Sequence, residues 1–102
     1  MHLVQILLPL YDNDRARQPD DLFRQVRSEL TELFGGLTTY SRAPARGLWQ
    51  DDSGETSQDE IVVYEVMAPE LDRDWWRGFR EQLEHSFRQK QIVVRSQHIE
   101  LL

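Results

Sequence analysis

The chain has 102 residues and no cysteine. This absence excludes an iron–sulfur cluster held by thiolates, a cysteine nucleophile, a redox-active cysteine pair and a thiolate zinc site. The three histidines, His2, His85 and His98, share no metal-ligand spacing. We therefore expect no metal and no other cofactor. The lack of cysteine is also compatible with a cytoplasmic location.

Basic residues are scarce as well. Twelve Lys and Arg stand against eighteen Asp and Glu, which gives a formal net charge of -6. Proteins that bind nucleic acid obtain much of their affinity by neutralising phosphates, so an acidic chain without a basic cluster is a poor candidate. The N-terminal apolar run from Leu3 to Leu10 is too short to span a bilayer and follows no Lys or Arg. We expect no nucleic-acid partner, no membrane insertion and a cytoplasmic protein.

Four of the five glycines lie in one stretch, Phe34 to Gly54, which raises the question of a phosphate-binding loop. Such loops place their glycines just before a helix, where free N–H groups face the anion. Gly35 and Gly36 instead follow a predicted helix, at the negative end of its dipole. Their position predicts the end of a helix and argues against a phosphate loop.

The alternation of apolar and polar residues predicts one ferredoxin-like domain over residues 1–102. A chain of this length can bury one core without a metal or a disulfide. The expected elements are a strand at His2–Tyr11, a helix at Pro19–Phe34, a strand at Leu37–Arg42 that resumes at Gly47–Gln50, a strand at Asp59–Ala68, a helix from Asp72 to about Gln89 and a strand at Gln91–Leu102. The order βαββαβ predicts a four-stranded antiparallel sheet with two helices on one face.

The two helices are predicted from residues that favour helix ends and from stripes of apolar side chains. In the first helix Gly35 stands at the position of a left-handed cap, and Asp72 stands at the N-cap position of the second. The stripes expected to face the core are Leu22, Val26, Leu30 and Leu33 in the first helix, widened by Phe23 and Phe34, and Trp76, Phe79, Leu83 and Phe87 in the second. The stretch DDSGETSQ between the second and third strands is expected to be a polar turn.

Each strand presents alternate side chains to opposite faces of the sheet. The residues expected toward the helices are Val4, Ile6, Leu8, Val62, Tyr64 and Val66. The open face would then carry Leu3, Gln5, Leu7, Ile61, Val63, Glu65 and Met67, together with either Val93, Arg95, Gln97 and Ile99 or the opposite set with Ser96 and His98. This mixed face is too apolar to be left in water. It predicts a homodimer that pairs Glu65, Arg95 and Gln5 across two sheets, or a cavity for a small molecule.

Two residues are candidate acid–base groups. Glu65 interrupts an apolar strand, so its carboxylate must be paired, face water or have a raised pKa. A structural partner such as Arg95 is the favoured alternative. His98 could act as a general base, although a lone histidine on a strand more often has a structural role.

Four residues are candidates for ligand binding: Tyr40, Arg42, Trp49 and Arg95. Three of these surround the bend expected at Ala43–Ala45. An arginine beside aromatic side chains could clamp an anionic aromatic ligand by a charge-assisted hydrogen bond and stacking. Alternatively the aromatic side chains cover an edge of the core, which is the interpretation we favour.

The stretches FGGLTTYSRAPARGLW and DEIVVYEVM, with the acidic glycine turn between them, resemble a family of small uncharacterised bacterial ferredoxin-like domains. That family shares a helix ending in F-x-G-[LVI]-T, a G-x-W strand, a turn and an aliphatic strand. The chain is also similar to the wider dimeric α+β barrel group, which includes monooxygenases and isomerases. The resemblance implies a homodimer that binds a small molecule on the open sheet face. The alternatives that it implies are a cofactor-independent enzyme and a small-metabolite sensor, so enzymatic activity stays open.

Overall fold

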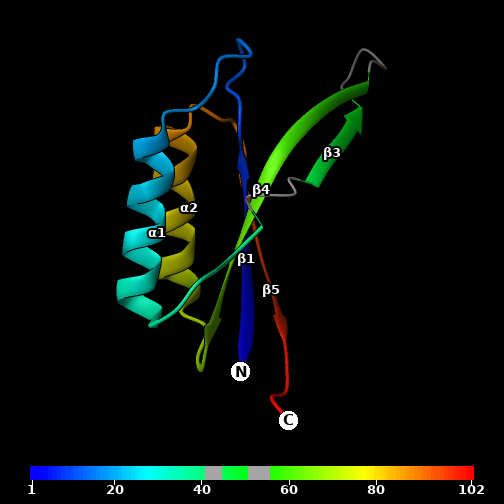
Figure 1. Ribbon diagram of the computed structural model, residues 1–102. Coiled ribbons are helices and arrows are strands. Elements are labelled where there is room, and N and C mark those ends of the chain that lie inside the picture. The colour runs from blue at the N-terminus through cyan, green and yellow to red at the C-terminus, as the bar shows by residue number, and fades with distance from the viewer. Residues whose placement is uncertain (41–44, 51–55) are drawn as a thin grey trace.

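The computed structural model describes the backbone of residues 1–40, 45–50 and 56–102 and the side chains of residues 1–40 and 60–102. Its elements are β1 (His2–Pro9), α1 (Asp20–Phe34), β2 (Thr38–Thr39), β3 (Ala45–Gln50), β4 (Thr56–Ala68), α2 (Arg73–Ser86) and β5 (Val93–His98). The strands form one antiparallel sheet in the order β2-β4-β1-β5, and β3 also pairs with β4. Both helices cover the same face of this sheet (Figure 1). The predicted ferredoxin-like α+β architecture is confirmed.

β2 and β3 lie along the same edge of β4, as the two arms of one interrupted strand should. Thr39 pairs with Tyr64 and Ala45 pairs with Ile61. The bend between the arms was predicted at Ala43–Ala45; residues 43 and 44 lie outside the described residues, and Ala45 begins β3. The polar turn was expected to extend to Gln58, but β4 begins at Thr56, which pairs with Gln50. Backbone pairing does not need apolar side chains, so the polar character of these residues led to a wrong prediction of where β4 begins.

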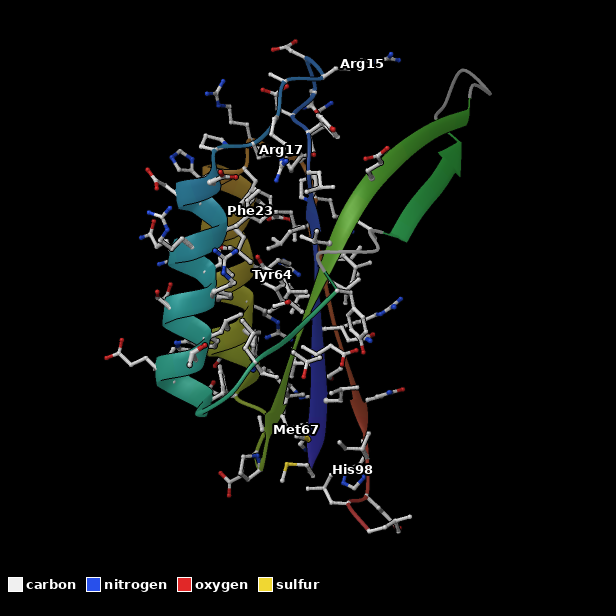
Figure 2. The ribbon with its side chains drawn as sticks, viewed as in Figure 1. Arg15, Arg17, Phe23, Tyr64, Met67 and His98 are labelled. Carbon is white, nitrogen blue, oxygen red and sulfur yellow. The ribbon has the colours of Figure 1, made fainter. Side chains whose placement is uncertain are left out.

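The core lies between the sheet and the two helices, and it contains the strand residues predicted to face them. Its buried members are Val4, Ile6, Leu8, Phe23, Val26, Leu30, Val62, Tyr64, Val66, Trp76, Phe79, Leu83, Phe87 and Ile92. Figure 2 shows Phe23 and Tyr64 between α1 and the sheet. Leu33 was expected in this core, but its side chain is 55% exposed. Helical spacing places Leu33 between Leu22 and Val26 around α1, but Leu33 stands in the last turn, where its neighbour Phe34 is the side chain that packs on Trp75 and Trp76.

The helix starts and stops follow local chemistry. Gly35 has φ 76° and its N–H donates to Thr31 O, which confirms the left-handed cap of α1. The Asp72 carboxylate accepts from the Trp75 N–H at 3.1 Å and caps α2 as predicted. α2 ends at Ser86, earlier than the expected Gln89, because Arg88 adopts a left-handed conformation with φ 53°. The sequence did not indicate this end because no glycine stands there.

β5 spans only Val93–His98, whereas the sequence predicted a strand to Leu102. His98 pairs with His2, the first residue of β1, so the neighbouring strand offers no ladder beyond it. The Ile99 N–H makes one further bond to Met1 O at 2.9 Å. None of the helices in the described ranges has the length and apolar character needed to cross a membrane.

Candidate functional site

Four side chains form a hydrogen-bonded line across the open face of the sheet, here called the polar row: Arg95, Gln5, Glu65 and Tyr40. Arg95 Nε donates to Gln5 Oε1 at 2.8 Å, and Gln5 Nε2 donates to Glu65 Oε1 at 2.6 Å. Tyr40 Oη donates to Glu65 Oε2 at 3.2 Å. The sheet register makes this line, because Gln5 is directly opposite both Glu65 and Arg95. Candidates that are far apart in the sequence thus meet in one row.

Apolar rows flank the polar row on both sides. Leu7 lies opposite Val63 on one neighbouring strand and Val93 on the other. On the other side of the row, Leu3 lies opposite Met67 and Gln97. Val93 is 43% exposed and Met67 is 49% exposed. The open face therefore places a charged strip between two partly exposed apolar strips.

The charges of the polar row are ordered along it. Arg95 is the positive end, and Glu65 is negative two strands away. The hydrogen bond to Glu65, followed by the negative charge of that carboxylate and by partial burial, raises the pKa of Tyr40 above its usual 10.0. Tyr40 therefore stays a neutral donor to Glu65 at physiological pH.

The remaining predicted site residues do not join this row. His98 lies opposite His2 and shares the helix-facing side of the sheet with Ser96 and Val4, so it and Glu65 are on opposite faces. Trp49 is placed in β3 opposite Ser57, but its side chain lies outside the described side chains. Arg42 also lies outside the described residues.

His98 lies instead beside His2, at the end of the sheet where both termini lie (Figures 1 and 2). Its ring meets the edge of the His2 ring at a centroid distance of 5.2 Å. Desolvation lowers the pKa of His2 below its usual 6.5, and the N-terminal ammonium, His98 and Arg73 lower it further. Across residues 1–40 and 60–102, no three His, Asp or Glu side chains are grouped as metal ligands would be.

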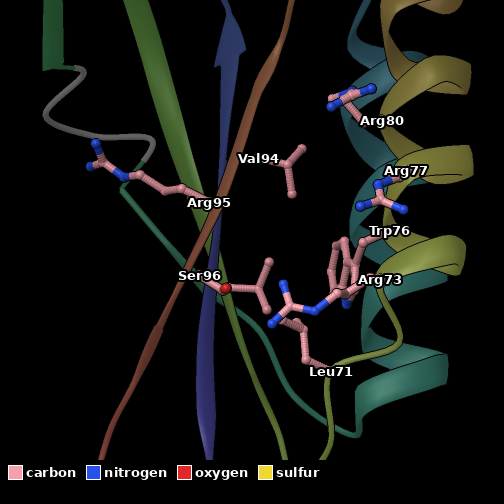
Figure 3. Close-up of a pocket in the computed structure, with 9 residues that line it drawn as sticks. Leu71, Arg73, Trp76, Arg77, Arg80, Val94, Arg95 and Ser96 are labelled. Atoms are coloured by element: carbon pink, nitrogen blue, oxygen red, sulfur yellow. The ribbon is translucent and has the colours of Figure 1, made fainter.

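A second feature is a cleft on the helix-facing side of the sheet, between α2 and β5, here called the arginine cleft (Figure 3). Its volume is about 180 Å³. It is lined by Val4, Leu71, Arg73, Trp76, Arg77, Arg80, Val94, Arg95 and Ser96. Figure 3 shows Arg73 extended from the first turn of α2 toward Ser96, whereas the Arg95 side chain points to the other face of the sheet.

The sequence analysis missed this cleft, although a signal for it is present. Arg73, Arg77 and Arg80 follow one another at spacings of four and three, so they share one side of α2 beside the buried Trp76. That spacing predicts an arginine stripe on a helix. It does not say what the stripe faces, because the opposite wall comes from β5, and the face that β5 turns toward the helices depends on its register.

A scan against protein-family models finds no match, and a search of curated proteins finds none. Among solved structures the chain is similar to a phage SAM lyase in complex with S-methyl-5′-thioadenosine, with a TM-score of 0.63 and 16% identity over 94% of this chain and 79% of that one. A phage SAM lyase in the apo state matches with a TM-score of 0.61 and 14% identity over 94% and 78%. A point variant of CutA1 from Pyrococcus horikoshii OT3 matches with a TM-score of 0.60 and 12% identity over 100% and 86%. At these identities the likeness shows that the chain shares their small α+β fold.

Proposed function

We propose that this chain is a single domain that forms a homodimer by packing the open faces of two sheets together. The observation that carries the proposal is the order of charges along the polar row. A two-fold axis that lies in the interface, parallel to β1 and over Gln5, places Arg95 of each copy over Glu65 of the other. Such an isologous contact uses the same patch twice and is closed, as in most soluble dimers.

The spacing of the sheet supports this arrangement. Adjacent strands lie about 4.8 Å apart, so Arg95 on β5 and Glu65 on β4 stand at about equal distances on either side of Gln5 on β1. The two-fold axis also brings the apolar strip of Leu7, Val63 and Val93 over the same strip of the other copy, and the strip of Leu3 and Met67 over its own counterpart. Burial of both strips supplies the attraction, and the charges set the orientation.

The area of the face is at the small end for such a contact. β1 contributes eight residues, the part of β4 that pairs with it eight, β5 six and β2 two, which at about 3.3 Å per residue and about 4.8 Å between strands gives roughly 380 Å² on each copy. Two faces contribute about 760 Å² in projection, which is typical of a weak interface. We therefore expect a dimer that forms only at micromolar or higher concentration.

Sedimentation velocity at micromolar concentration tests the proposal. The wild-type protein should sediment at twice its monomer mass of 12.1 kDa. Met67→Asp should dissociate it, because a charge then enters an apolar strip. Leu33→Asp is the matched control, since Leu33 is 55% exposed and Met67 is 49% exposed, but Leu33 lies on α1. A wild-type monomer would refute the dimer, and a dimer that survives Met67→Asp would refute this face as its interface.

Charge reversal tests the two-fold geometry itself. Arg95→Glu should dissociate the dimer, because it places a carboxylate over Glu65 of the other copy. The double variant Arg95→Glu with Glu65→Arg should restore it. Within each copy the Gln5 amide can turn over and serve the reversed charges, because it has both donors and an acceptor. Failure of the double variant to restore the dimer, while far-UV circular dichroism shows a folded chain, would refute the geometry.

The enzyme alternative draws on the same residues but has less support. Glu65 accepts a hydrogen bond at each carboxylate oxygen, and Arg95 donates to Gln5. Side chains whose hydrogen-bonding groups are already paired with one another are better suited to stabilising an interface than to transferring protons. Small-molecule binding remains part of the proposal. It is supported by the resemblance to dimeric α+β barrel domains and by the phage SAM lyase of this fold that holds S-methyl-5′-thioadenosine.

A further inference from the structure

The arginine cleft has a concentration of positive charge that the fold does not explain. The chain has a net charge of -6, yet the described lining of the cleft holds no aspartate or glutamate and presents the guanidinium groups of Arg73, Arg77 and Arg80. Arg95 also lines the cleft, but its guanidinium group lies on the open face. Arg73, Arg77 and Arg80 are about one helical turn apart along α2, so their guanidinium groups repel one another across a short distance. The packing of α2 on the core uses the neighbouring stripe of Trp76, Phe79 and Leu83 and does not require the arginines.

The donors of these arginines are incompletely used within the part of the chain that the structure describes. Arg73 makes no hydrogen bond or ion pair there. Arg80 Nε is buried without a hydrogen-bond partner, and its distance to Glu84 Oε1 is 4.0 Å. Arg77 meets Asp74 at 3.3 Å, but their side chains are 64% and 95% exposed, and such a pair is worth little. Arg80 Nε itself has no accessible surface and lies beside Glu84, but the Arg80 side chain is 41% exposed, so its terminal guanidinium nitrogens remain for a ligand.

We propose that the arginine cleft binds a small phosphate monoester. Arg73, Arg77 and Arg80 contact the phosphoryl oxygens, and the remainder of the molecule lies against Leu71 and Val94. This inference goes beyond the proposed dimer and does not depend on it, because the cleft and the open face are on opposite sides of the sheet.

The number and geometry of the donors favour phosphate. A phosphate monoester carries a charge near −2 at neutral pH and three terminal oxygens, so it can engage more than one guanidinium group. Arginine matches phosphate in a two-pronged geometry that lysine cannot provide. A single carboxylate has two oxygens and one charge and would leave part of the cluster unneutralised.

The size of the cleft limits the ligand. Its volume of about 180 Å³ is smaller than the roughly 300–1,000 Å³ of sites for drug-sized molecules. It holds a phosphoryl group and a few carbon atoms, with any larger part in solvent. The apolar side chains of Leu71 and Val94 provide contact for an uncharged body next to the phosphate.

Isothermal titration calorimetry with phenyl phosphate tests the proposal, with inorganic phosphate and benzoate as comparison probes. We expect saturable binding of phenyl phosphate at low ionic strength, weaker binding of inorganic phosphate and no saturable binding of benzoate. Arg73→Gln and Arg77→Gln should each weaken phenyl phosphate binding about tenfold or more. Arg24→Gln is the matched control, because Arg24 pairs with Asp21 on α1 at the same spacing as Arg77 with Asp74.

A site-specific signal complements the affinities. In nuclear magnetic resonance spectra the Arg80 Nε–H resonance should shift on titration with phenyl phosphate. No saturable binding, an affinity unchanged by Arg73→Gln and Arg77→Gln, or equal binding of benzoate would each overturn the proposal. Met67→Asp should leave phenyl phosphate binding unchanged, so a failure of the dimer and a failure of the cleft are distinguishable.

Discussion

Replacement of Trp76 by alanine tests the orientation of α2, on which both the core and the arginine cleft depend. Trp76 is 6% exposed. Its ring stacks on Phe34 at a centroid distance of 5.2 Å and meets the rings of Trp75 and Phe79 at 4.8 and 5.8 Å. The variant would leave a cavity at the junction of the two helices, so the loss should be large.

The magnitude follows from the area that the ring removes from water. A buried aromatic side chain covers about 150–250 Å², which at about 25 cal/mol per Å² corresponds to roughly 4–6 kcal/mol. Alanine keeps the Cβ, and the cavity partly collapses, so we expect Trp76→Ala to lower the free energy of unfolding by about 3–5 kcal/mol. For a chain of this size each kcal/mol changes Tm by about 4–8 °C, and Tm should fall by at least about 12 °C.

Urea unfolding followed by far-UV circular dichroism measures this cost, with both proteins at one concentration because dimerisation makes stability concentration-dependent. Leu33→Ala is the control, and it should cost less than about 1 kcal/mol because Leu33 is 55% exposed. A cost below about 1 kcal/mol for Trp76→Ala would refute the orientation of α2. The arginine cleft, formed by the side of the helix next to Trp76, would be refuted with it.

Three further predictions concern other parts of the fold. Gly35→Ala should lower the free energy of unfolding, measured in urea, by about 1–2 kcal/mol because Gly35 has φ 76°. Gly36→Ala, at a residue without that conformation, should lower it by less than about 0.5 kcal/mol. Equal losses for the two variants would contradict the left-handed cap. Gln18→Ala should cost about 1–3 kcal/mol by the same measurement because its buried amide donates to Phe87 O at 2.9 Å, and an unchanged midpoint would contradict that bond. The folded-state pKa of His2 lies below its usual 6.5, so the unfolded chain binds more protons below that pH and stability falls on acidification. The Tm of the wild type should therefore drop more between pH 7.5 and pH 5 than that of His2→Gln, and identical drops would contradict the lowered pKa.

Much of the fold was predictable because short stretches encode it. Asp72 and Gly35 mark helix ends by chemistry that involves only three or four neighbouring residues. Alternation in β1 and β4 correctly divided their side chains between the core and the open face. Predictions were wrong where no local signal exists, as at the end of α2, where a left-handed arginine stands in place of glycine.

The candidate site was predictable only in part. The sequence marked Glu65 as a carboxylate in an apolar strand that needed a partner, and Arg95 and Tyr40 as polar side chains of interest. It could not choose between the two faces of the last strand, because a shift of one residue exchanges them. The ladder between β1 and β5 makes that choice, since it places Arg95 beside Gln5 and turns His98 to the other face.

The sequence by itself therefore determined the order of the elements, most of the residues that its helices and central strands bury and the presence of an unusual carboxylate, because each depends on the spacing of residues within one segment. The tertiary structure alone decided the polar row and the arginine cleft. The row joins residues from three strands and Tyr40, which follows β2, and the cleft joins one side of α2 to one face of β5. Strand register and packing between segments far apart in the chain bring these groups together, and the spacing of residues within one segment does not predict either.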